Sequence, residues 1–339
     1  MSQPFVYQLT DQKVLVAQPD STSAASPGPG QMVVQTLMTA ISPGTELAAW
    51  AGAPPLRPTP HPYPRLMGYC NVGRVTDLGP GIDGFCTGDL VLTHSAHRTH
   101  DMITAAQVLC KIPEGADLAT VSATYRFHLG YMACLKAKVA AGDQVAVIGL
   151  GTLGMTSAAV AHLAGAQVTG FSNHLNSSHD MRLWGLSKTH HKTNYNPSSS
   201  GSFDSVLSTT NIWSDWQLAL EITRRGGTIV PIGFPGRGQT APDFNPLASQ
   251  YFYDKQLTIA ACGYVPNLDV APIDLRFTLK RNCTFLMQAI IDGRLPAADL
   301  VEDVRPATDL AKTYAEMATQ RSSGRTIVLD WQKGMTCRN

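Results

Sequence analysis

Residues 145–154 read VAVIGLGTLG, and this stretch decides the fold of the 339-residue chain. An apolar run at 144–148 predicts a buried strand, and the small residues of 153–164 predict a helix that follows it. The glycines between them have the spacing GxGxxG, which suits a tight turn, a close approach of phosphate to the backbone and close packing of helix on strand. The sequence therefore predicts a dinucleotide-binding turn formed by Gly149, Gly151, Thr152, Leu153 and Gly154.

The pattern continues beyond the turn as an alternation of strands and helices. We expect strands at 167–171, 203–210, 226–235 and 256–265, and a helix at 216–225. Such alternation is typical of a parallel, doubly wound sheet. Gly233, in the second half of the strand segment 226–235, is a further expected cofactor-binding position.

The residues after the second strand indicate which nicotinamide cofactor the turn would bind. An NAD site places a carboxylate there for the ribose 2′-hydroxyl, whereas a 2′-phosphate needs neutral or basic groups. Ser172, Asn173 and His174 occupy this position, and no acidic residue lies between Gly154 and Asp180. This favours NADPH. The alternative is an NAD site in which these three residues are ordinary polar loop residues.

The first 120 residues have a different sequence pattern from the segment that follows them. Short apolar runs are separated by proline- and glycine-rich turns, which is typical of a β-rich domain. Residues 51–64 contain six prolines, and we predict a loop there that borders a cleft. The C-terminal part, from residue 274, is expected to form two helices and a closing strand that could return to this domain, at 275–292, 307–320 and 325–329.

The overall composition argues against several classes of partner. The formal net charge is +1 and the basic residues are scattered, so neither a nucleic acid nor a membrane surface is expected as a partner. No apolar run reaches the roughly 18 residues that span a bilayer, and the N-terminus lacks a signal pattern. The seven cysteines form no CxxC pair. We expect a cytoplasmic protein that acts on a small-molecule substrate.

Taken together, the motifs resemble the medium-chain dehydrogenase/reductase superfamily. They are ISPGTE at 41–46, LMGYCNVGRVTDLG at 66–79, GDLVL at 88–92 and the segment 129–154. The resemblance implies an α/β protein with a GroES-like β-rich catalytic domain at 1–125 and 265–339. It also implies a Rossmann cofactor-binding domain at 126–264, with the active site in the cleft between the two domains. By analogy we expect a homodimer joined through the segment 257–262, although an inner strand would suit that segment equally well.

Zinc members of this superfamily hold a catalytic metal with cysteine, histidine and acidic ligands. At the matching positions this chain has Pro43, Tyr69, Cys70 and about Tyr125. Proline has no donor atom, and one thiolate does not make a three-ligand zinc site. We therefore expect no metal. The alternative is a relocated site that uses three nearby histidines, His94, His97 and His100.

Without a metal, hydrogen-bond donors must stabilise charge on the substrate oxygen. The resemblance matches Thr45 to the hydroxyl that relays protons in zinc members, and Tyr69 and Tyr125 place phenols at former ligand positions. His128 is a further candidate acid. The two tyrosines could equally fill the volume that a metal and its water would occupy. Glu46 is expected to hold a neighbouring loop in place rather than to react.

These observations predict a zinc-independent, NADPH-dependent oxidoreductase. The PGTE form of the motif resembles bacteriochlorophyllide and cyclitol dehydrogenases, which act at C–O bonds, whereas the loss of zinc resembles quinone and enoyl reductases. We expect hydride transfer to a ketone or enone-type carbonyl compound that is a secondary metabolite. The alternatives are a catalytically silent NADPH-binding protein and a secondary-alcohol dehydrogenase that works in the oxidative direction.

Overall fold

The computed structural model describes residues 4–20, 25–54, 60–174, 180–196, 202–263, 273, 275, 277–319 and 324–333. The chain divides into two compact units. Unit 1 takes its residues from Met1–Tyr125, Pro266–Gly293 and Ala297–Asn339, and unit 2 from Arg126–Val265 and Arg294–Pro296. Among the described residues, no helix is both long and apolar enough to cross a membrane.

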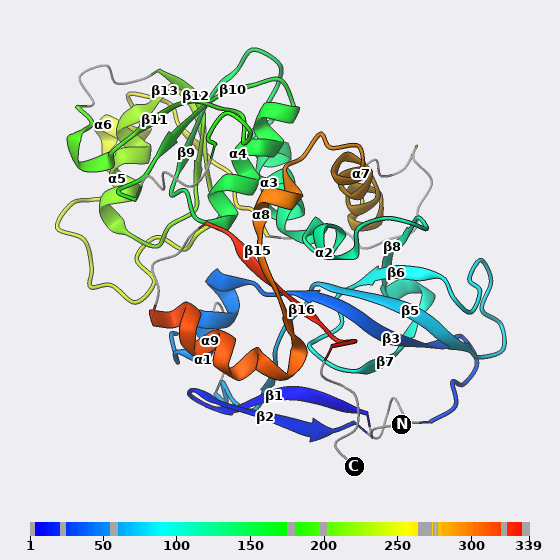
Figure 1. The fold of residues 1–339 in the computed structure, drawn as a ribbon. Coiled ribbons are helices and arrows are strands. Elements are labelled where there is room, and N and C mark those ends of the chain that lie inside the picture. The colour runs from blue at the N-terminus through cyan, green and yellow to red at the C-terminus, as the bar shows by residue number, and fades with distance from the viewer. Residues whose placement is uncertain are drawn as a thin grey trace. The chain divides into compact units, whose positions relative to one another are not determined.

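Unit 2 is built on a sheet whose paired strands are all parallel, in the order β11-β10-β9-β12-β13-β14 (Figure 1). Numbered from β9, this order is 3-2-1-4-5-6, the arrangement of a Rossmann dinucleotide-binding domain. The predicted doubly wound sheet is therefore confirmed. The strands are β9 (Gln144–Ile148), β10 (Gln167–Phe171), β11 (Leu186–His190), β12 (Phe203–Ser208), β13 (Thr223–Pro231) and β14 (Thr258–Ile259).

Helices pack on this sheet through small and apolar residues. In Figure 1 the strands stand between α4 and α5, and α4 contacts β9 and β10 while α5 contacts β12 and β13. The inner face of α4 carries buried alanine, serine and threonine side chains, so its backbone can lie close to the strands. The helices of this part are α3 (Thr124–Ala137), which begins at the end of unit 1, α4 (Thr152–Leu163), α5 (Trp213–Ile222) and α6 (Ser249–Phe252).

Unit 1 is β-rich and contains two sheets. The larger has the order β15-β16-β3-β5-β6-β8, with β7 also paired to β3, and the smaller has the order β2-β1-β4. Apart from β15 and β16, which run parallel, the paired strands are antiparallel. The strands are β1 (Phe5–Asp11), β2 (Val14–Pro19), β3 (Gln31–Ala40), β4 (Arg65–Leu66), β5 (Asn71–Leu78), β6 (Leu90–Thr93), β7 (His100–Thr104), β8 (Val108–Ile112), β15 (Val301–Pro306) and β16 (Thr326–Asp330).

The C-terminal segment of unit 1 closes its core. Tyr314 and Leu310 of α9, with Leu329 of β16, are buried against Leu9 and Ile41 from the N-terminal part of the chain. Residues far apart in sequence therefore share one apolar cluster. The helices of unit 1 are α1 (Ala48–Trp50), α2 (Leu118–Val121), α7 (Leu279–Ile291), α8 (Ala297–Leu300) and α9 (Leu310–Thr319).

Several element boundaries differ from the sequence-based expectations. The strand β12 ends at Ser208 rather than at 210, and β13 spans Thr223–Pro231 rather than 226–235, so Gly233 lies after the strand. The helix α5 begins at Trp213 rather than at 216, and α9 spans Leu310–Thr319 rather than 307–320. The helix expected at 216–225 ends at Ile222, because Lys255 donates to the carbonyls of Leu220 and Glu221 there and the chain continues as β13. The strand expected at 256–265 is reduced to Thr258–Ile259, and residues 264 and 265 lie outside the described part. The helix expected from residue 275 begins at Leu279, where the Thr278 side chain caps it.

Candidate active site

The glycine turn between β9 and α4 has the backbone geometry that a bound phosphate requires. Gly149 has a φ of +90°, which disfavours any residue with a side chain. A Cβ on Gly154 would stand 1.8 Å from the carbonyl oxygen of Gly149, so the start of the helix crosses the turn without room for one more atom. Gly151 is the N-cap of α4 and brings no capping side chain. The N-terminal amides of this helix therefore suit an anion.

Two threonines after β12 support the turn from the neighbouring strand. The Thr209 hydroxyl lies 3.0 Å from the carbonyl oxygens of both Ile148 and Gly149, to which it donates. A Cβ on Gly233 would stand 2.2 Å from the Thr210 carbonyl oxygen, so Gly233 packs directly against this pair. Sequence reasoning missed Thr209. The signal was a hydroxyl at the carboxyl end of a parallel strand, where ligands of such sheets bind.

The three residues after β10 form a short polar turn. The hydroxyl of Ser172 accepts a hydrogen bond from the backbone amide of His174 at 3.0 Å, and Ser172 is buried. Asn173 and His174 are exposed. The turn presents an amide and an imidazole to solvent and carries no carboxylate of its own.

In unit 1, the PGTE motif forms a short π-helical turn, Pro43–Leu47, with Ser42 as its N-cap. Proline suits the first helical position because its fixed φ is helical and its missing N–H would have no partner there. The carbonyl of Ser42 accepts from the amides of Thr45 at 3.2 Å and Glu46 at 2.8 Å. This turn holds the hydroxyls of Ser42 and Thr45 on the same side as Tyr69.

Tyr69 lies at the centre of a polar and aromatic cluster in unit 1. Its phenolic oxygen is 2.7 Å from the Ser42 hydroxyl and 3.4 Å from the Thr45 hydroxyl. Its ring meets the Tyr125 ring edge to face, with centroids 5.7 Å apart, and the His94 ring meets Tyr125 in the same way at 4.3 Å. The structure therefore brings together Thr45, Tyr69 and Tyr125, and it adds Ser42 and His94, which were not expected as catalytic candidates.

His94 lies in this cluster as a largely buried imidazole. Burial lowers the pKa of His94 below its ordinary 6.5, and the hydrogen bond to the Tyr69 carbonyl, 3.1 Å away, opposes that effect in part. The neutral form is therefore the one that the folded protein prefers at neutral pH.

This burial predicts a dependence of stability on pH. Because the folded pKa of His94 is lowered, the unfolded chain takes up a proton first as the pH falls through 6.5, and the free energy of unfolding should decrease there. His94→Gln, which cannot titrate, should flatten this decrease, as measured by urea unfolding at pH values between about 7.5 and 5. A decrease of equal steepness in the variant would contradict the assignment.

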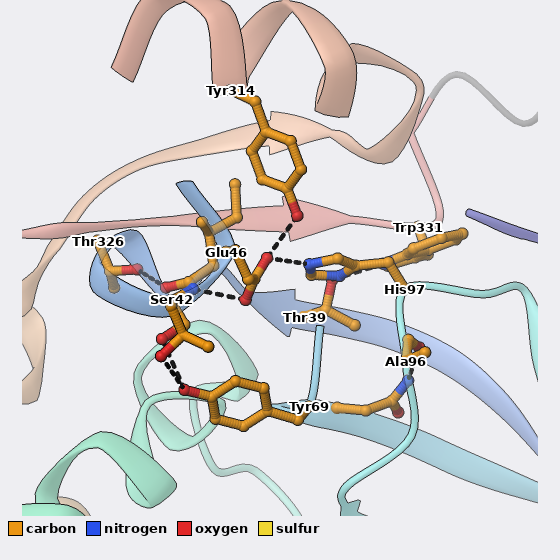
Figure 2. A network of polar contacts seen from close by, with 12 residues as sticks. Thr39, Ser42, Glu46, Tyr69, Ala96, His97, Tyr314, Thr326 and Trp331 are labelled. Atoms are coloured by element: carbon orange, nitrogen blue, oxygen red, sulfur yellow. Dashed lines mark hydrogen bonds and ion pairs between the residues drawn. The ribbon is translucent and has the colours of Figure 1, made fainter. Parts of the chain in front are cut away.

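Behind the cluster lies the buried carboxylate of Glu46, shown in Figure 2. One of its oxygens accepts from the Ser42 amide at 2.7 Å. The other lies 2.9 Å from His97 Nε2 and 2.5 Å from the Tyr314 hydroxyl. Ser42 and Glu46 belong to the same π-helical turn, whereas His97 lies between β6 and β7 and Tyr314 lies on α9. The expectation that Glu46 holds a neighbouring loop agrees with these contacts.

The remaining sequence candidates are buried side chains. His128 is buried in unit 2, on α3, and Cys70 is fully buried next to Tyr69 in the chain. The His97 ring contacts Glu46 and also Thr39, 2.8 Å from its Nδ1. In the part of the chain that the structure describes, no three histidine, cysteine or acidic side chains group as metal ligands.

Comparisons with known proteins place this geometry in context. The chain is 26% identical to 2-desacetyl-2-hydroxyethyl bacteriochlorophyllide A dehydrogenase of Rhodobacter capsulatus, over 90% of the chain and 92% of that protein. The curated proteins that this chain resembles over most of its length are dehydrogenases, so the chain is an oxidoreductase, as predicted. No family model matches the chain.

Solved structures of such dehydrogenases share the fold. The structure of 2R,3R-butanediol dehydrogenase from Bacillus subtilis has a TM-score of 0.79 at 15% identity and covers 97% of this chain and 99% of its own. A putative zinc-binding dehydrogenase from Sinorhizobium meliloti, bound to NADP, has a TM-score of 0.77 at 14% identity, with 97% and 100% covered. The oxidoreductase therefore has the predicted α/β fold, with a GroES-like and a Rossmann domain.

Proposed function

We propose that this oxidoreductase is zinc-independent and uses NADPH to reduce a ketone or enone-type carbonyl compound. The observation that carries the proposal is the Tyr69 cluster. At a position that matches a metal ligand of zinc relatives, the phenol of Tyr69 lies 2.7 Å from one hydroxyl and 3.4 Å from another. This arrangement supplies hydrogen-bond donors where those relatives use a Lewis acid.

The residues of unit 2 fit a nicotinamide dinucleotide. The crowded glycines and the start of α4 would hold the pyrophosphate, and Thr209 fixes the turn from behind. The turn Ser172–His174 offers polar and imidazole groups to a 2′-phosphate, which supports NADPH over NADH. The Sinorhizobium meliloti dehydrogenase, which has the same fold, binds NADP, and this supports a nicotinamide dinucleotide as the ligand of unit 2. A bound NADPH supplies a hydride for the carbonyl compound.

The residues of unit 1 handle the charge that hydride transfer creates. As hydride reaches the substrate carbon, negative charge develops on its oxygen, and the Tyr69 phenol can donate its proton there. Thr45 is partly exposed and lies next to Tyr69, so its hydroxyl can donate a second hydrogen bond. Tyr125 packs against the Tyr69 ring and restricts its orientation.

The residues do not fit the catalytic zinc of related dehydrogenases. Pro43 offers no ligand atom, and the Tyr69 phenolic oxygen is hydrogen-bonded to the Ser42 hydroxyl. A three-ligand site needs side chains that this cluster does not contain. A metal assay on purified protein should find far less than one zinc per chain, and about one per chain would overturn this part of the proposal.

The reductase proposal predicts NADPH consumption with simple carbonyl probes. We expect turnover with at least one of an aryl methyl ketone, a cyclic ketone and a cyclic enone, followed at 340 nm. NADPH should bind more tightly than NADH. Tyr69→Phe keeps the ring and loses the hydroxyl, so kcat should fall by about a hundredfold while NADPH affinity is retained.

The same experiment distinguishes the alternatives. Tight NADPH binding with no turnover of any probe would favour a silent binding protein. A second candidate, oxidation of a secondary alcohol, is favoured by the similarity to the hydroxyethyl bacteriochlorophyllide dehydrogenase. Reduction of NADP⁺ by secondary alcohols, with no carbonyl reduction near neutral pH, would support that candidate instead. Tighter binding of NADH than of NADPH would overturn the cofactor assignment.

A further inference from the structure

The Ser42 hydroxyl is the closer of the two hydroxyls that contact Tyr69. Its oxygen is 2.7 Å from the phenolic oxygen, an ordinary O–H···O distance, whereas Thr45 is 3.4 Å away. Ser42 is only 3% exposed, so it lies beneath the phenol rather than beside a substrate. A group in this place acts on the reaction through Tyr69.

The backbone of Ser42 is fixed on both sides. Its carbonyl accepts from the amides of Thr45 and Glu46, and its own amide donates to the Glu46 carboxylate at 2.7 Å. Pro43 follows directly, and its ring fixes φ at position 43 and restricts the backbone conformation of Ser42 before it. The position of the Ser42 hydroxyl is therefore set by Glu46 as well as by the local turn.

Glu46 is fixed in turn by side chains from other parts of unit 1. Trp331 Nε1 donates to the Thr39 hydroxyl at 2.9 Å, and the Thr39 oxygen lies 2.8 Å from His97 Nδ1. His97 Nε2 faces the Glu46 carboxylate at 2.9 Å, and since an ionised carboxylate only accepts hydrogen bonds, His97 is the donor in this contact. Figure 2 shows this chain of contacts, from Trp331 through Glu46 to Ser42 and Tyr69.

We propose that Ser42 is a positioning residue that donates a hydrogen bond to the phenolic oxygen of Tyr69, and that Glu46 holds Ser42 in place for this. The proposal rests on the proposed reductase function. With a bound nicotinamide to supply hydride to the substrate carbon, the proton of Tyr69 would go to the substrate oxygen. Tyr69 is then a phenolate stabilised by Ser42 until water returns the proton.

The first test needs no substrate. In protein labelled with ¹³Cζ-tyrosine, the Tyr69 resonance is identified as the one lost in Tyr69→Phe. Ser42→Ala should move this resonance further than Thr45→Ala does, because its oxygen is closer, and Ser42→Thr should largely restore it. Glu46→Gln should also move it. The control Thr76→Ala, which loses a hydroxyl bonded to the Val33 carbonyl, should leave it in place.

The second test uses the carbonyl probe that the wild-type protein reduces. Ser42→Ala should lower kcat about tenfold, with KM values for probe and NADPH within about twofold, and Ser42→Thr should recover most of the loss. An unmoved Tyr69 resonance in Ser42→Ala, or an equal loss of kcat in Ser42→Thr, would overturn the proposal. If the wild-type protein turns over no probe, the proposed function fails, while the resonance shifts still decide whether Ser42 and Glu46 position Tyr69.

Discussion

Glu46→Ala is expected to lower the free energy of unfolding by about 3–5 kcal/mol, as measured by urea denaturation followed by circular dichroism. The substitution removes the acceptor of three donors at once: the Ser42 amide, His97 Nε2 and the Tyr314 hydroxyl. His97 and Tyr314 are fully buried, so water cannot replace the lost carboxylate. Each donor left without a partner costs about 1–3 kcal/mol.

A second carboxylate of unit 1 provides the matched control. Glu316 pairs with Arg305 at 2.5 Å, but its side chain is 34% exposed. Water can solvate both partners after Glu316→Ala, so the loss should stay below about 1 kcal/mol. Similar effects of Glu46→Ala and Glu316→Ala would show that the buried contacts of Glu46 contribute little. Glu46→Gln, which keeps one acceptor oxygen, should fall between the two.

The parts of the fold that could be predicted from the sequence are those set by local chain geometry. The strands at 144–148 and 167–171 have the predicted bounds, because alternating small and apolar residues end at glycine or serine turns there. Gly149 and Gly154 were predictable because their constraints are also local. The positive φ of Gly149 and the close approach of Gly154 to the Gly149 carbonyl both arise within six residues of chain. The closing strand near residue 326 was also found, since an apolar β-branched run follows a glycine.

The polar contacts of unit 1 could be predicted only in part. The N-cap position of Ser42 could have been predicted, because a serine four residues before a glutamate is close to a helix-capping pattern. The contact between Tyr314 and Glu46 spans 268 residues, and that between His97 and Glu46 spans 51. Nothing in the local sequence of α9 indicates that the hydroxyl of Tyr314 meets a buried carboxylate. Such contacts depend on how the C-terminal helix returns to the N-terminal sheets.

Gly154→Ala is expected to destabilise unit 2 by about 3 kcal/mol or more and to abolish NADPH binding. The added Cβ would stand 1.8 Å from the Gly149 carbonyl oxygen and 3.4 Å from the Thr209 hydroxyl. The obstacle is backbone rather than the end of a flexible side chain. The start of α4 must therefore move away from the turn, and the amides that would bind pyrophosphate move with it. Thermal unfolding and NADPH titration by fluorescence measure the two effects.

The control for Gly154→Ala is a glycine of ordinary φ with space around it. Gly44, in the PGTE turn of unit 1, has no atom within 4 Å of an added Cβ, so Gly44→Ala should change stability by less than about 1 kcal/mol. Both variants add one methyl group at a helical glycine, and they differ in whether a carbonyl occupies the space. A Gly154→Ala protein as stable as Gly44→Ala, with NADPH affinity intact, would contradict the close packing of α4 on the turn. Loss of NADPH affinity at nearly full stability would instead place the effect in the helix N-terminus itself, where a small displacement of the amides is enough to weaken an anion site.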